Sequence, residues 1–233
     1  MRRSTYYYRG DMNSGIEKKR IDFKPTALIC VVCCYFWLSE YYFTPRFLPR
    51  SWGVLGWFLQ EPVFYFVIGI PFTWLVLRRN PLDLGLRIGQ WRLWVPLAAG
   101  ACVFLAVLIP LVCCFDSSLL AYYPQYKPAR SSVGAFVLMT LASVFYMVGW
   151  EYFNRGFFTL GLSPRFGYHA AAIAMMPFFF AHFGKPPLEA LGAIFGGVLM
   201  GLLAIRVKSI WPCVIVHSFM QLWMDVCAVY LFA

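Results

Sequence analysis

Apolar residues in this chain occur in long blocks separated by short polar segments. Each block approaches the about 20 residues that a helix needs to cross a lipid bilayer. The blocks cover residues 26–43, 57–77, 95–115, 133–162, 168–183, 188–206 and 210–232. This pattern predicts an all-α fold, a polytopic transmembrane bundle of about seven helices, with an eighth weak segment as the alternative.

The composition supports a membrane protein and excludes several other classes. Only 13% of the 233 residues are charged and 61% are hydrophobic, whereas a soluble domain carries about 25% charged residues. So few charges cannot cover a surface that faces water, which argues against a soluble enzyme, a disordered chain and a disulfide scaffold. The 8 cysteines lie in apolar runs, where they are expected to be small buried apolar side chains.

The basic residues predict how the chain is oriented. Residues 1–25 form a polar, basic arm ahead of a single membrane domain over 26–233. With the arm inside, fourteen of the 20 Lys and Arg residues lie in the arm and inner loops, five lie in outer loops, and Arg155 lies within a span. Because Lys and Arg favour cytoplasmic segments, this bias of fourteen to five predicts a cytoplasmic N-terminus and a C-terminus on the outside. The expected partners of the basic arm are membrane lipids, not nucleic acid.

A small set of polar residues falls inside or beside the apolar blocks, where an ionisable side chain costs several kcal/mol unless it is paired or wetted. The set is Glu40, Glu151, Asn154, Arg155, His182, Glu189, His217, Gln221 and Asp225. By default such residues are candidates for function.

Most of these residues fall into three short segments that are candidates for a catalytic site. Each segment also has a purely structural interpretation. Glu151 and Arg155 are at i and i+4 and share a helix face. They are either a structural ion pair or a functional carboxylate held by its arginine. His182 follows a run of aromatic residues, as a packed side chain or as a site residue. His217 and Gln221 also share a face, as a buried hydrogen bond or as two groups that touch one substrate. Their depths in the bilayer differ by about 10 Å at 1.5 Å per residue, which helix tilt could close.

Taken together, the three segments resemble the CPBP family (CAAX prenyl protease and bacteriocin-processing), also called Abi proteins. The family pattern is Glu-Glu-x-x-x-Arg, then Phe-x-x-x-His, then His-x-x-x-Asn. The matching residues here are Glu151 and Arg155, Phe178 and His182, and His217 and Gln221. The resemblance covers a core over residues 133–225. The chain departs at two positions, because Trp150 replaces the first glutamate and Gln221 replaces the asparagine.

The resemblance implies an intramembrane endopeptidase in a multi-pass protein of a bacterial plasma membrane. In it Glu151 would deprotonate a water held with His182, while His217 and Gln221 would donate hydrogen bonds to the scissile carbonyl oxygen. Arg155 would hold Glu151. The substrate would be a membrane-bound or lipidated protein or peptide.

Two further assignments stay open. Glu189 could support the site or cap the start of the next helix, where acids are favourable. His182, His217 and Glu151 could bind a divalent metal such as zinc, since two histidines and a carboxylate form a common catalytic set.

Two other functions compete with the protease. The missing glutamate could mark a catalytically inactive relative that acts in bacteriocin immunity or as a membrane scaffold. The intramembrane Glu and His residues could instead form the proton relay of a small transporter, although no internal repeat of the kind that many transporters have is visible.

Overall fold

The computed structural model describes residues 22–41 and 47–232, and its regular elements over those residues are all helical, which confirms the all-α bundle. The longer helices are α1 (Lys24–Tyr41), α2 (Gly53–Phe72), α3 (Trp91–Phe115), α5 (Val133–Glu151), α7 (His169–Phe180), α8 (Pro187–Val207) and α9 (Trp211–Val226), and the short ones are α4 (Ser117–Tyr122) and α6 (Gly161–Phe166). The predicted basic arm lies outside the described residues as far as residue 21, and so does the side chain of Glu40.

Each of the seven predicted apolar blocks contains a helix within the described residues. Within the described residues, five continuous helical stretches are long and apolar enough to cross a membrane, namely Arg50–Leu77, Trp91–Phe115, Val133–Phe166, Pro187–Val207 and Trp211–Leu231. Two shorter apolar helices, Lys24–Ser39 and His169–Phe180, correspond to the first and fifth blocks. The protein is therefore an integral membrane protein.

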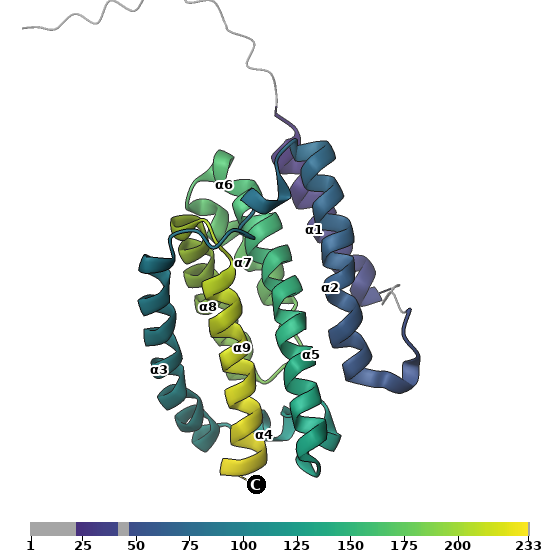
Figure 1. Cartoon of the computed structure of the whole chain (residues 1–233), viewed down its shortest axis with the longest axis vertical. Coiled ribbons are helices and arrows are strands. Elements are labelled where there is room, and N and C mark those ends of the chain that lie inside the picture. The colour runs from purple at the N-terminus through teal and green to yellow at the C-terminus, as the bar shows by residue number, and fades with distance from the viewer. Residues whose placement is uncertain (1–21, 42–46, 233) are drawn as a thin grey trace, which may run out of the picture.

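The helices run back and forth along one common direction (Figure 1). The start of α1 lies at the same end of the bundle as α6, and the C-terminus lies at the opposite end beside α4. In Figure 1, α2, α5, α9 and α3 stand in front, with α7 and α8 behind them. Adjacent long helices are therefore mostly antiparallel, as expected for short connections.

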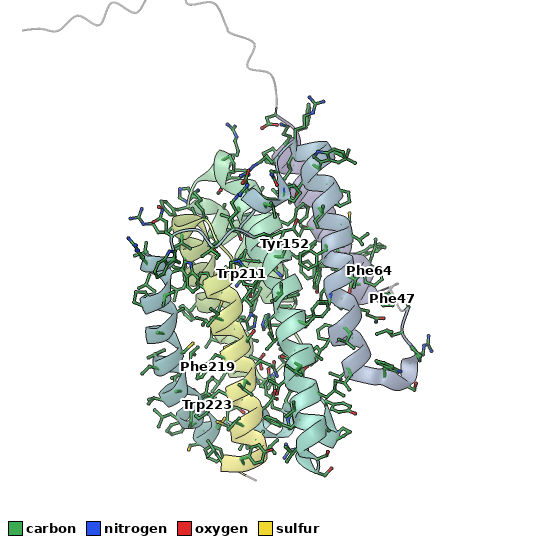
Figure 2. The ribbon with its side chains drawn as sticks, viewed as in Figure 1. Phe47, Phe64, Tyr152, Trp211, Phe219 and Trp223 are labelled. Atoms are coloured by element: carbon green, nitrogen blue, oxygen red, sulfur yellow. The ribbon has the colours of Figure 1, made fainter. Side chains whose placement is uncertain are left out.

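The exterior of the bundle is apolar, as a lipid-facing surface must be. On α3 the side chains of Val103, Phe104 and Val107 are more than 60% exposed. The inner side of this helix is held to α9, where Trp223 donates from Nε1 to the carbonyl of Ala106 at 3.1 Å and stacks on Phe219 (Figure 2).

Three long helices continue into wider, π-helical turns. The segment Thr73–Leu77 extends α2, Tyr152–Leu160 extends α5, and Cys227–Leu231 extends α9. All nine residues of Tyr152–Leu160 are buried. The charged residues of the fourth block therefore lie at the junction between α5 and a π-helical segment, a type of irregularity that is frequent at functional sites.

Glycine allows α5 to approach α2 closely. A Cβ atom at Gly149 would lie 2.6 Å from the Cα atom of Pro62, which is backbone that cannot rotate away. A similar contact joins α8 to α7, where a Cβ atom at Gly201 would lie 2.8 Å from the Cβ atom of Ala171. Small residues at such crossings are a common means of helix association in membranes. The α2–α5 contact fixes the height of residues 61 and 150 relative to each other.

We expect Gly149→Ala to lower the stability of the bundle by about 1–3 kcal/mol, the usual cost of overpacking. The measurement is thermal unfolding in detergent. The matched control is Gly100→Ala on α3, where an added Cβ atom would meet nothing within 4 Å. Equal stability of the two variants would show that α2 and α5 do not approach as described.

Candidate active site

Three ionisable side chains are buried together where α5 meets α9. The Nδ1 atom of His217 lies 2.7 Å from Oε1 of Glu151, and Nε of Arg155 lies 3.3 Å from Oε2 of the same carboxylate. Glu151 is 0% exposed and Arg155 is 2% exposed. The predicted pairing of Arg155 with Glu151 is thus confirmed, and the carboxylate has a second partner that the sequence did not reveal.

The ring of Phe178 connects this group to His182. The Arg155 guanidinium lies over the Phe178 ring, with Cζ 3.9 Å from its centroid, a favourable cation–π geometry. The carbonyl of Phe178 lies 2.7 Å from Nδ1 of His182. Because a carbonyl only accepts, Nδ1 carries the hydrogen, and the neutral ring keeps a lone pair on Nε2. The Phe-x-x-x-His spacing therefore orients the histidine and supports the arginine.

On α9, the side chains of His217 and Gln221 each form a hydrogen bond with an acidic side chain. The acid behind His217 is Glu151, and Nε2 of Gln221 donates to Oδ2 of Asp225 at 3.1 Å. Asp225 is 1% exposed. The i and i+4 pair thus presents one imidazole and one amide whose positions are fixed by hydrogen bonds. Such support keeps functional groups in place before a substrate arrives.

A cavity of about 660 Å³ receives three of the predicted site residues, His182 from the turn after α7 and His217 and Gln221 from α9. Its polar lining includes Tyr35, Ser39, Glu61, Tyr65, Tyr122, Gln125, Lys127, Tyr146, His182, Lys185, His217 and Gln221. The lining extends from the α2–α5 contact to α4 and to the turn between α7 and α8. Glu151 does not line this cavity, because it lies behind His217.

Glu189 stands in the first turn of α8, at the edge of this region. Its carboxylate accepts from the hydroxyl of Tyr123 at 2.9 Å and from Nζ of Lys185 at 2.8 Å. Burial, and next the charge of Glu189, raise the pKa of Tyr123 well above its usual value, so this phenol stays protonated and donates. Glu189 therefore links the segment that follows α4 to the start of α8. Both of the roles considered for it, support and capping, are compatible with these contacts.

The sequence reasoning missed two acids of this region. Asp225 was noted only as an ionisable residue within a span, and its spacing of four from Gln221 was the available signal. Glu61 was not noted, although it lies within the second apolar block, where any carboxylate is a functional candidate. Glu61 is 1% exposed and lines the cavity. It lies on α2, outside the segment that carries the family pattern.

The residues proposed for a metal do not fit that role. Among residues 22–41 and 47–232, no group of three or more His, Cys, Asp and Glu side chains is placed to hold a metal ion. Within the described residues both histidines keep Nε2 free, but the Glu151 carboxylate lies at Nδ1 of His217 and beside Arg155, so it is not placed as the third ligand. We therefore derive no step through zinc or another divalent metal.

The comparison with family models gives a match to the family described as type II CAAX prenyl endopeptidase Rce1-like, over residues 132–223. This segment contains all three motifs and confirms the resemblance to the CAAX-protease type of the CPBP family. It extends from the start of α5 into α9. Comparisons with curated proteins and with solved structures gave no match.

The buried charges make an asymmetric prediction about stability. Glu151→Gln leaves Arg155 buried without an acid, so we expect a loss of about 3–5 kcal/mol, as for other broken buried pairs. Arg155→Met should cost less, because Glu151 keeps His217 as its partner. The double variant should be more stable than Glu151→Gln alone.

Thermal unfolding in detergent measures all three variants. The control is Asp83→Asn, which removes an i,i+4 partner of Arg87 in a pair that is about half exposed, with side-chain values of 58% and 49%, and should have little effect. Strictly additive effects in the double variant would mean that Glu151 and Arg155 do not interact.

Proposed function

We propose that this protein is an intramembrane endopeptidase of the CAAX-protease type, which cleaves a membrane-bound or lipidated protein or peptide. The observation that carries the proposal is that His182, His217 and Gln221, from the last two motifs, line one cavity inside a transmembrane bundle. The family match over residues 132–223 supports the same class of activity. A cavity of about 660 Å³ has room for a short extended peptide segment and a water molecule.

In this proposal the α9 pair stabilises the charge that develops on the scissile carbonyl oxygen. Gln221 offers an amide N–H, because only one of its two hydrogens is used by Asp225. The imidazolium form of His217 would donate from Nδ1 to Glu151 and from Nε2 to the carbonyl oxygen. Donors aimed at such an oxygen in a water-poor site are usually a large part of catalysis.

His182 and Glu151 then have separate parts. His182 holds the attacking water through the lone pair on Nε2. Glu151, buried behind His217, acts as a positioning residue that fixes the imidazole and its charge, with Arg155 holding the carboxylate. Direct attack by water suits this cavity, since no Ser or Cys next to a base lines it among the described residues.

One observation favours a second candidate. Trp150 stands where the family carries its first glutamate, and its ring lines the cavity. A catalytically inactive relative that binds a membrane peptide without cutting it would retain the same fold and the same cavity. The two candidates differ in one outcome, which is whether peptide bonds are broken.

We expect the purified protein to cut within a panel of quenched peptides ending in prenylated Cys-a-a-X, tested beside unlipidated transmembrane peptides. His217→Ala and Gln221→Ala should each lower kcat by about 100-fold or more, as for other oxyanion donors. Glu151→Gln should also abolish cutting, because it removes the anion behind His217. Fluorescence release measures the rate.

The matched control is His169→Ala. His169 is the remaining histidine of the chain, is exposed, and lies at the start of α7, away from the cavity. Absence of cutting by the wild-type protein, with unchanged peptide binding in all variants, would favour the inactive relative. Full activity of His217→Ala would contradict the site itself.

We further infer from the Lys and Arg distribution that the N-terminus is cytoplasmic, so the α4 end of the bundle faces outward. Epitope tags at the two termini test this in sealed, right-side-out vesicles. Added protease should remove the C-terminal tag and spare the N-terminal one, and detergent should expose both. The reverse pattern would invert the orientation.

A further inference from the structure

Glu61 is a buried carboxylate among the residues that line the cavity. Its Oε2 atom accepts from the hydroxyl of Tyr35 at 2.5 Å. Its Oε1 atom has no hydrogen-bond partner among the described residues, although the residue is only 1% exposed. An unsatisfied buried carboxylate oxygen is costly. A water or a substrate group in the cavity would satisfy it.

The position of Glu61 is set by the closest backbone contact between α2 and α5. Pro62, the next residue, packs against Gly149, the residue before Trp150. One turn further along α2, the ring of Tyr65 lies 5.9 Å from the ring of Trp150. Glu61 therefore lies across this helix crossing from position 150, where the family pattern has its first glutamate.

Trp150 itself occupies that position with an aromatic ring. Its centroid lies 6.4 Å from the ring of His182 and 5.9 Å from that of Tyr146. Trp150, Glu61 and His182 all line the same cavity. On α5, the position of the family's first glutamate thus carries the indole of Trp150. The acid on the adjacent side of the cavity is Glu61 on α2.

We propose that Glu61 is the catalytic residue that takes the proton from the attacking water, in place of the acid absent at position 150. This inference rests on the proposed endopeptidase function. It deepens that function by naming the base, and it assigns the base to a helix outside the segment that matches the family.

The step balances as follows. Oε1 of Glu61 takes one proton from water, and the water oxygen bonds to the scissile carbonyl carbon, whose π electrons move onto the oxygen held by His217 and Gln221. When the carbonyl re-forms, the C–N bond breaks. The proton passes from Glu61 to the leaving nitrogen, so the products are a new C-terminus and a new amine, and Glu61 is again a carboxylate.

The contact with Tyr35 suits this role. It fixes one carboxylate oxygen and leaves the other for the proton transfer, which contributes typically 10²–10⁴-fold to such reactions. The same contact also joins α1 to α2. A purely structural Glu61 would act through its contacts with Tyr35 and Tyr65. Glu61→Gln keeps an oxygen that can accept from both, which is why it is the variant of choice.

Glu61→Gln keeps an oxygen that can accept from Tyr35 but removes the base. We expect kcat on the prenylated peptide that the wild-type protein cuts to fall by about 10²–10⁴-fold, with KM little changed. Glu61→Asp should retain part of the rate. Tyr35→Phe removes the hydrogen bond and keeps the carboxylate, so its loss should be much smaller than that of Glu61→Gln. Asp83→Asn, on an exposed loop, serves as the acid control.

Trp150→Glu provides a rescue. Added to Glu61→Gln, it should return a measurable part of the activity by placing an acid on α5. Wild-type rates in Glu61→Gln, or equal losses in Glu61→Gln and Tyr35→Phe, would overturn the inference while the losses in His217→Ala uphold the proposed function. An inactive wild-type protein that Trp150→Glu activates would also overturn it. If neither protein cuts, the proposed function fails and the inference fails with it.

Discussion

The burial of Glu151, Arg155 and His217 in one group is the constraint on which the rest of the site depends. A charge without a partner inside the bilayer costs several kcal/mol, so each of these side chains requires the others. Glu151 contacts both of the others, Arg155 at 3.3 Å and His217 at 2.7 Å, and the Phe178 ring covers the guanidinium of Arg155. These contacts tie α5, α7 and α9 together at one height. The imidazole that faces the cavity is positioned as a result.

The supporting acids form a layer behind the surface of the cavity. Glu151 stands behind His217, and Asp225 stands behind Gln221. Neither acid is among the residues that line the cavity. Burying a polar residue in a membrane costs free energy. Here these residues fall into two groups, one that lines the cavity and one that hydrogen-bonds to the first. This arrangement explains why polar residues of the chain are grouped at i and i+4 spacings on α5 and α9.

Much of this could be predicted from the sequence, for definite physical reasons. The apolar blocks predicted the five long and two shorter apolar helices of the described residues, because a helix that crosses lipid must be apolar over most of its length. The i and i+4 rule predicted the Glu151–Arg155 pair. The rule could not predict the contact of Glu151 with His217, which depends on how α5 packs on α9, nor the short α4. Glu61 was missed for a different reason, since it lies far from the motifs and only the crossing at Gly149 brings it near them.

The contact between Gly149 and Pro62 has a mechanical consequence. The acid on α2 and the hydrogen-bond donors on α9 are carried on opposite sides of α5, so the angle at which α2 crosses α5 sets the distance between them. The rings of Tyr65 on α2 and Trp150 on α5 pack beside this contact, so a change in the angle would move them as well. Bilayer thickness and lateral pressure act directly on such crossings. Under the proposed function, the lipid around the protein would thus influence the rate of cleavage, independent of how well a peptide fits the cavity.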